Sequence, residues 1–465
     1  MIKVEVKSVN ASHVRIVCDR GVLQEIVEYF SFFAPAYQFH PKFKARIWDG
    51  KIRLVSPRDS LLYVGLIDKL REFCEDSEYE FVDNSGYSNS KEDVPENIAE
   101  IIAKDVNLDP KYKVRDYQAQ YIYNAIRDSR SINLSPTSSG KSLIIYLIMS
   151  YYRMKYQSRT LIVVPTVGLV KQMANDFLDY GCDPSIIHGI SAGASKKTSH
   201  PIVVSTWQSL ARIKEKSWFE QFDVILGDEV HTFAAKSLQD IMNSLTECYW
   251  RHGFTGTIGE DSKVNKMVLE GLFGTVRKFV STKDLINSGT VANFDVTAIV
   301  MKHGDQIKKE FHQNLAKLQG GAKKYSAERE FLTNHDVRNK FIRKIVKNNR
   351  DNNGLILFDL VEKHGKVLKK YLETIPGTKL HFIYGGTPAD ERERVRQLVE
   401  NDNLEVVTLD FEEFKLNIPV DTFVDLSDGT TKKAMDLKPS DDISDAWLQE
   451  NWREFEDFNH YEVSK

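Results

Sequence analysis

The apolar positions of the chain repeat with different periods along its length. Every second residue is apolar over 2–6 and again over 14–18, an apolar helical stretch follows at 23–32, and strand-like sequence returns after it. Alternation with a period of two is typical of a half-buried strand. Residues 1–83 therefore predict a small α+β domain.

A polar break separates this domain from the next part of the chain. Residues 84–97 are rich in Gly, Ser and Asn and contain Pro95, a composition typical of a linker. Short β-branched runs then alternate with helical patterns, at 132–134, 161–165, 201–206 and 223–229. Strands separated by helices predict an α/β domain with a doubly wound parallel sheet, which we place at 98–276.

A second α/β unit begins further along. Helical patterns at 328–347 and 363–373 alternate with strand-like runs at 354–358, 379–385 and 406–409. We assign residues 277–409 to a connector and the start of this unit, and residues 410–465 to an acidic segment that does not continue the pattern.

Composition and charge narrow the class of protein. At 465 residues and 53.4 kDa the chain has room for about three domains, and 42% hydrophobic residues exclude global disorder. Its net charge of −3 conceals an asymmetry, because residues 410–465 carry 15 acidic and 6 basic side chains, net −9, which leaves +6 on residues 1–409. The four cysteines form no C-x-x-C pair, and no apolar run approaches the roughly 18 residues of a membrane span. We therefore expect a protein of a reducing cytoplasm.

The stretch after the strand at 132–134 has the residue types of a phosphate-binding loop. Phosphates are gripped by backbone N–H groups at a helix N-terminus, with a Lys for the outer phosphates and a hydroxyl for Mg²⁺. The candidate nucleotide-binding residues here are Pro136, Thr137, Ser138, Ser139, Gly140, Lys141 and Ser142. Ser135 stands where the motif G-x-x-x-x-G-K-[ST] has its first glycine, so an ordinary strand–helix turn remains the alternative.

A pair of carboxylates follows at the end of the apolar strand VILG. Ligands of open α/β sheets bind at this end of the strands. Asp228 is placed to hold Mg²⁺ together with Ser142, and Glu229 to orient the water that attacks the γ-phosphate. With Lys141 these two are the predicted catalytic residues, and a solvated acidic turn is the alternative.

A basic strip with interleaved aromatic residues lies in the first domain. Between positions 41 and 58 six cationic residues accompany a single acid, Asp49. Such a strip neutralises phosphates while its aromatic rings stack on bases or pack in the core. A strand would place Lys42, Lys44 and Arg46 on one face. The candidate DNA-binding residues are Lys42, Lys44, Arg46, Trp48, Lys51 and Arg53; the alternative is a solvated face over a core of Phe43 and Trp48.

The order of these motifs resembles that of superfamily 2 helicases of the DExH type. Their R-x-Y-Q signature is matched upstream by Arg115 and Gln118, whose amide is implied to read the adenine base of ATP. Two segments, at 163–172 and 203–210, resemble those that hold the DNA backbone and imply contacts by Thr166, Ser205 and Thr206. The motifs that couple nucleotide to DNA imply roles for His231, Thr255, Gly256 and Thr257, although an interior histidine held by its neighbours would also explain His231.

The resemblance covers residues 1 to about 409 and is closest to the recombination helicases of phages. It implies two RecA-like motor domains, the second one partial, and an ATP- and Mg²⁺-dependent activity. It also implies unwinding of forked, junction or RNA–DNA hybrid structures in phage recombination and replication, in the host cytoplasm.

One expected motif is missing from the sequence. The family closes the ATP site with a Q-x-x-G-R-x-x-R pattern, whereas the only arginine after Leu409 is Arg453, in unrelated surroundings. An arginine finger is worth about 10³–10⁵ in turnover. We therefore expect a chain that binds ATP and hydrolyses it poorly on its own. The alternatives for 410–465 are a diverged domain, an intein remnant, or an interruption whose missing motifs a second chain supplies.

The missing arginine-finger motif also allows a function other than that of an enzyme. The chain would then be a DNA-structure-binding protein that holds ATP without turning it over.

Overall fold

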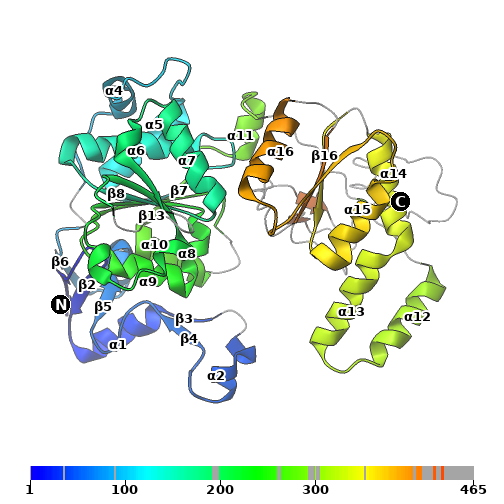
Figure 1. Ribbon diagram of the computed structural model, residues 1–465. Coiled ribbons are helices and arrows are strands. Elements are labelled where there is room, and N and C mark those ends of the chain that lie inside the picture. The colour runs from blue at the N-terminus through cyan, green and yellow to red at the C-terminus, as the bar shows by residue number, and fades with distance from the viewer. Residues whose placement is uncertain are drawn as a thin grey trace. The chain divides into compact units, whose positions relative to one another are not determined.

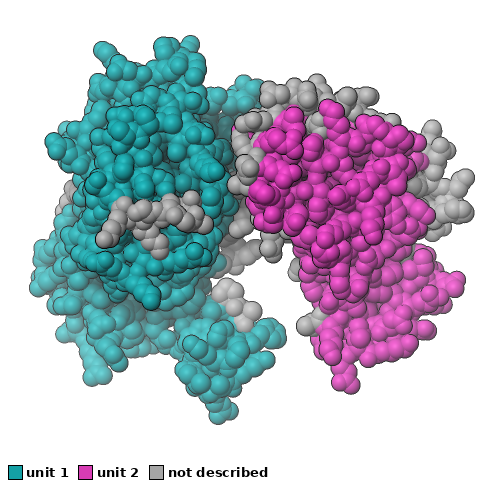
Figure 2. Space-filling view, in the orientation of Figure 1, with its two compact units in different colours: residues 1–293 teal, residues 294–465 magenta. Residues whose placement is uncertain are grey.

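The computed structural model describes residues 2–34, 37–87, 91–190, 198–258, 263–291, 299, 304–349, 352–401, 405–410, 423–425 and 431–433. Two compact units make up the chain, residues 1–293 and 294–465 (Figure 2). Among the described residues no helix is both long and apolar enough to cross a membrane.

The first unit begins with a four-stranded sheet in the order β5-β2-β1-β6. The alternating residues Val4, Val6, Val14 and Ile16 are buried, so the period-two pattern does mark strands that bury one face. Two amphipathic helices accompany this sheet (Figure 1). The elements are β1 (Lys3–Ser8), β2 (His13–Val17), α1 (Arg20–Tyr29), β5 (Leu61–Tyr63), α3 (Ile67–Asp76) and β6 (Glu80–Asn84).

A hairpin with a helical tip extends from this domain. Strands β3 (Ser31–Phe33) and β4 (Lys51–Arg53) pair antiparallel and carry the short helix α2 (Pro41–Lys44) between them (Figure 1). The expectation that Lys42, Lys44 and Arg46 share one strand face is therefore wrong. Proline is preorganised for the first helical position, and the His40 ring caps the helix by accepting a hydrogen bond from the Lys42 N–H at 3.2 Å. Arg46 follows the helix in the left-handed region, at φ +57°.

The centre of the first unit is a seven-stranded parallel sheet in the order β13-β7-β12-β11-β8-β10-β9. Helices cover both of its faces, as expected for a doubly wound sheet (Figure 1). Strands β8, β10 and β11 are buried along their whole length, which explains their continuous β-branched runs. The strands are β7 (Arg130–Leu134), β8 (Thr160–Val164), β9 (Ile187–Ile190), β10 (Ile202–Thr206), β11 (Val224–Asp228), β12 (Trp250–Thr255) and β13 (Thr275–Arg277). The helices are α4 (Ile98–Asp105), α5 (Asp116–Asp128), α6 (Lys141–Tyr156), α7 (Val167–Asp179), α8 (Trp207–Leu210), α9 (Lys236–Ser244), α10 (Lys263–Phe273) and α11 (Thr282–Asn287).

The four-stranded and seven-stranded sheets of the first unit share one hydrophobic core. Val4, Ile26 and Leu66 of the N-terminal domain belong to the same buried cluster as Ile225 and Phe273 of the parallel-sheet domain. The backbones meet most closely at Gly65, where a Cβ would lie 2.0 Å from the Glu270 carbonyl oxygen and 2.9 Å from the Gly274 nitrogen. Only glycine allows this approach.

The second unit holds a three-stranded parallel sheet in the order β14-β16-β15. The helical pattern at 328–347 is split into two helices at His335, which is extended and caps the second helix by accepting from the Arg338 N–H at 3.3 Å. The expectation of one continuous helix is thus wrong, because a side-chain cap starts a new one. The elements are α12 (Asp305–Ala316), α13 (Gly321–Asn334), α14 (Asp336–Asn348), β14 (Gly354–Phe358), α15 (Lys366–Leu372), β15 (Lys379–Ile383), α16 (Ala389–Asn401), β16 (Glu405–Asp410), β17 (Phe423–Asp425) and β18 (Thr431–Lys433).

Replacing Gly65 by alanine tests the contact between the N-terminal domain and the parallel-sheet domain. The added methyl would force two backbones apart, so we expect Gly65→Ala to lower the free energy of unfolding by about 1–3 kcal/mol in urea titrations. Gly21→Ala is the control, because a Cβ at Gly21 has no atom within 4 Å; it should be neutral or stabilise by up to about 1 kcal/mol. Equal effects of the two changes would contradict the tight approach.

Candidate functional site

The predicted phosphate-binding loop lies between β7 and α6, at the carboxyl edge of the parallel sheet. The Ser135 N–H donates to the Thr255 carbonyl at 2.9 Å, and the Ser135 and Ser139 hydroxyl oxygens lie 2.6 Å apart. Ser138 and Gly140 have positive φ, at +64° and +80°, whereas Ser135 does not. A serine therefore fits where the motif has its first glycine, because that position needs no left-handed backbone.

Gln118 and Tyr117 hold this loop from α5. The Gln118 amide nitrogen donates to the Ser139 carbonyl at 2.8 Å and its oxygen accepts from the Arg115 N–H at 2.9 Å. The Tyr117 hydroxyl donates to the same Ser139 carbonyl at 2.9 Å. A Cβ on Gly140 would lie 2.4 Å from the Gln118 amide nitrogen, so a side chain there would displace this amide, and the φ of +80° independently favours glycine. Contact with adenine stays a prediction for Gln118; Tyr117 was not among the predicted site residues.

The two carboxylates stand at the end of β11, opposite the loop. Lys141 Nζ lies 3.1 Å from Glu229 Oε1 and 4.0 Å from Asp228 Oδ1, so the three predicted catalytic residues meet. Glu229 has a left-handed backbone, φ +52°, a conformation that costs a non-glycine residue energy and clusters at functional sites. Burial raises the pKa of Asp228 to about 6, against the opposing attraction of Lys141.

The residues predicted to couple nucleotide to DNA also meet here. His231 Nδ1 lies 2.9 Å from the Thr255 hydroxyl oxygen and 3.2 Å from Glu229 Oε2. The Thr255 hydroxyl donates to the Thr257 carbonyl at 3.0 Å and lies 3.3 Å from Glu229 Oε2. Glu229 is therefore in contact with β12, through Thr255, as well as with the loop lysine; Gly256 lies between Thr255 and Thr257.

The donors predicted for Mg²⁺ are Ser142 and Asp228. Asp228 Oδ1 is buried and makes no hydrogen bond within the described part of the chain, as a carboxylate oxygen that receives a cation would. Ser142 Oγ lies 2.9 Å from the hydroxyl of Tyr180, which follows α7. The described residues contain no group of three His, Cys, Asp or Glu side chains arranged to hold a metal ion by themselves. Mg²⁺ is usually held by one or two protein oxygens plus substrate phosphates, so the donor set fits it. Nothing in the local sequence points to Tyr180.

The hydroxyls predicted for the DNA backbone follow β8 and β10 at the same sheet edge. Thr166 is exposed and caps α7 by accepting from the Leu169 N–H at 3.3 Å. Ser205 and Thr206 are buried, and their hydroxyls hold the Ile190 carbonyl at 3.2 Å and the cap of α8. As the chain stands, only Thr166 of the three presents its side chain to solvent.

The basic strip is carried by the β3–β4 hairpin rather than by the parallel sheet. Lys42, Lys44 and Arg46 are exposed, and the Trp48 indole N–H donates to the Lys51 carbonyl at 2.9 Å. Arg53 forms an ion pair with Asp49. Phe43 and Trp48 are half-buried and pack against Tyr37 and His40, so the hairpin has a small aromatic core of its own.

Two family models match the chain. Residues 2–83 match the N-terminal domain of the DNA helicase UvsW, and residues 111–260 match the res subunit of type III restriction enzymes. A 154-residue segment is 32% identical to the DNA 3'-5' translocase XPB2 of Sulfurisphaera tokodaii and covers 32% of each protein.

The similarity to UvsW extends over most of the chain. The ATP-dependent DNA helicase UvsW of Enterobacteria phage T4 is 32% identical over 422 residues, 88% of this chain and 80% of that protein. One crystal structure of T4 UvsW aligns with 90% of this chain and 82% of its own, at 29% identity and a TM-score of 0.56. A second aligns with 60% of this chain and 100% of its own, at 32% identity and the same TM-score. With these matches, and with the loop, carboxylates and coupling residues at one sheet edge, the chain belongs to the UvsW family of superfamily 2 helicases.

Proposed function

We propose that this protein is an ATP-driven DNA motor that acts on branched DNA, such as forks, junctions and RNA–DNA hybrids, in phage recombination and replication. The observation that carries the proposal is the meeting of Lys141, Asp228, Glu229 and Thr255 at the carboxyl ends of three adjacent strands. The T4 relative is named an ATP-dependent DNA helicase, which supports the same class of activity here.

On the nucleotide side, each residue has a task that its position allows. Ser142 and Asp228 would hold Mg²⁺, which neutralises charge on the phosphates. Lys141 would exchange its ion pair with Glu229 for the outer phosphates. Glu229 is then freed to orient the attacking water and take its proton. Gln118 is proposed to hold the adenine in addition to bracing the loop.

Coupling to DNA is proposed to run through the contacts of Glu229. A shift of Glu229 on nucleotide binding would change its contacts with His231 and Thr255. Thr255 is the last residue of β12, and its carbonyl accepts a hydrogen bond from the Ser135 N–H at the start of the loop. We place the strand backbone at Thr166, with Ser205 and Thr206 behind it, because exposed hydroxyls suit contacts that are independent of sequence.

The hairpin is proposed to engage the branch point. Phe39 and Ile47 are 74% and 77% exposed at its tip, the most exposed large apolar side chains of the described chain. Cations surround them, and Lys44 Nζ lies 5.9 Å from the Phe39 ring centroid. Exposed apolar groups flanked by positive charge suit DNA where a duplex ends, since phosphates are neutralised while unstacked bases meet an apolar surface.

Steady-state ATP hydrolysis by the full chain, with and without forked DNA, tests the proposal. Because the arginine-finger motif is missing, we expect the chain alone to hydrolyse ATP slowly. Forked DNA should stimulate this turnover, and Lys141→Ala should abolish it because the loop loses the charge that holds the outer phosphates. Lys104→Ala, on the exposed side of α4, is the control and should retain turnover. Nucleotide and DNA binding without any turnover in the unmodified chain would contradict an autonomous motor. It would leave the two alternatives, a DNA-structure-binding protein and an interrupted motor whose missing arginines a second chain supplies.

The buried charge of Asp228 gives a pH-dependent prediction. Its pKa is raised from 3.8 to about 6, so the folded state binds the proton more tightly and loses stability as pH rises through this window. Without Mg²⁺, Asp228→Asn should therefore raise the free energy of unfolding at pH 7.5 by about 1–3 kcal/mol, and the gain should vanish below pH 4. In Asp109 a hydrogen bond from the Lys111 N–H lowers the pKa, so Asp109→Asn should not stabilise at pH 7.5. A gain that is independent of pH would refute the assignment.

Substitutions at the hairpin tip test its part in DNA binding. The double change Phe39→Ala and Ile47→Ala should weaken binding to forked DNA by roughly tenfold, because base–aromatic contact is worth about 1–3 kcal/mol. Affinity for blunt duplex should change little. Ile101→Ala, an exposed apolar residue on α4, is the matched control. An equal loss on fork and duplex would mean that the tip does not recognise the branch.

A further inference from the structure

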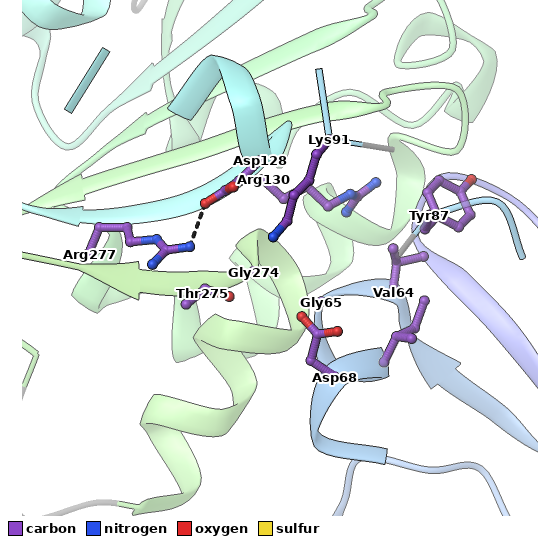
Figure 3. A pocket seen from close by; sticks show the side chains of 11 residues that line it. Val64, Gly65, Asp68, Tyr87, Lys91, Asp128, Arg130, Gly274, Thr275 and Arg277 are labelled. Atoms are coloured by element: carbon purple, nitrogen blue, oxygen red, sulfur yellow. Dashed lines mark hydrogen bonds and ion pairs between the residues drawn. The ribbon is translucent and has the colours of Figure 1, made fainter. Parts of the chain in front are cut away.

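A cavity lies at the opposite edge of the parallel sheet from the phosphate-binding loop. It has a volume of about 130 Å³ and lies where the first turn of α3 and the segment that joins the two domains meet the amino ends of β7 and β13. Figure 3 shows Lys91 reaching down into it between Arg277 and Arg130. It uses no residue of the nucleotide site.

Positive charge in this cavity exceeds the negative charge available to it. Both of its carboxylates already have partners: Asp68 pairs with Arg71 at 2.9 Å, and Asp128 pairs with Arg127 at 2.9 Å and with the lining residue Arg277 at 2.6 Å. Two further cations, Lys91 and Arg130, line the cavity and form no ion pair with any described carboxylate.

Arg130 is the unusual member of this set. The residue is 8% exposed, and its Nη2 donates to the Ala11 carbonyl, while Nε and Nη1 make no hydrogen bond within the described structure. The Tyr87 ring centroid lies 5.5 Å away. Leaving buried donors unsatisfied is costly, more so on a charged group. Burial, together with the positive charge of Arg251, also lowers the pKa of Arg130.

Arg251 provides a comparison within the same region. It is buried even more completely, yet its guanidinium donates to the carbonyls of Cys248, Met242 and Leu245 and to the Ser12 hydroxyl, at 2.6–3.3 Å. The fold thus gives each guanidinium nitrogen of one buried arginine a hydrogen-bond partner, whereas Nε and Nη1 of its neighbour at the cavity wall have none among the described residues.

We propose that this cavity is a binding site for a phosphate-type oxyanion, held by Lys91, Arg130 and Arg277. A tetrahedral oxyanion offers several acceptor oxygens to donors that converge from different directions, and charge-assisted hydrogen bonds are the strongest that such donors form. The volume is well below the roughly 300 Å³ at which pockets for larger organic ligands begin, which argues against a whole nucleotide. The anion is either free phosphate or a single phosphate of a DNA backbone.

Inorganic phosphate is the probe that tests the site. Since the proposed nucleotide loop would also bind phosphate, the measurements use the full chain with Lys141→Ala as background. We expect phosphate to raise Tm above the value in chloride at equal ionic strength, because a ligand that binds only the folded state stabilises it. Lys91→Ala in this background should weaken phosphate binding roughly tenfold, and Lys104→Ala should leave it unchanged.

Arg130→Met gives a second, independent measure. This variant should lose the phosphate-dependent rise in Tm; if it does not fold, the exposed Lys91 variant still decides the question. DNA titrations distinguish the two sources of phosphate. No response to free phosphate, together with weaker DNA binding and a salt slope smaller by about 1 for Lys91→Ala, would assign the site to a DNA phosphate. If phosphate and DNA binding are both the same in Lys91→Ala and Lys104→Ala, the proposal is wrong.

Discussion

The neighbouring positions of β7, β12 and β11 in the parallel sheet are the constraint on which the site depends. The carboxyl end of each strand carries one part of the candidate site: the phosphate loop follows β7, Thr255 ends β12, and the two carboxylates lie at the end of β11. Because parallel strands end at a common edge, residues up to 120 positions apart come within hydrogen-bond distance. Glu229 contacts both of the other parts, Lys141 and Thr255, and so connects the three parts of the site.

Most strands of the parallel sheet could be predicted from the sequence, but strand β12 and its buried polar contacts could not. Strands β8, β10 and β11 are evident as β-branched runs because both of their faces are buried. Strand β12 has no such signal, since its sequence is WRHGFT. Its polar residues are buried only because distant partners satisfy them: His252 lies between the Ser131 and Tyr152 hydroxyls, at 3.0 Å from each, and Arg251 is surrounded by carbonyls. Tertiary contacts of this kind leave no local pattern.

The same limit applies to the site residues. Lys141, Asp228 and Glu229 could be predicted because chemistry restricts their types and spacing, and the structure brings the three together. Tyr117 occupies the Tyr position of the R-x-Y-Q signature, but the signature gave it no role, and the structure shows its hydroxyl on the loop. Tyr180 reaches Ser142 through its hydroxyl from the end of α7, a contact that no spacing rule encodes. The prediction of a strand at Lys42, Lys44 and Arg46 is wrong for a different reason. The alternating charges suggested a strand, but Pro41 and the His40 cap favour a four-residue helix there.

The shared core of the first unit has a consequence for how the protein unfolds. Residues 2–83 match a family domain of their own, yet their apolar side chains pack in one cluster with those of the parallel sheet. Elements that share a core open together, as one cooperative unit in native-state hydrogen exchange. The N-terminal domain is therefore expected to unfold together with the parallel sheet. DNA at the hairpin, where we propose that it binds, would then be linked to the parallel-sheet domain by a stiff connection rather than by a flexible one.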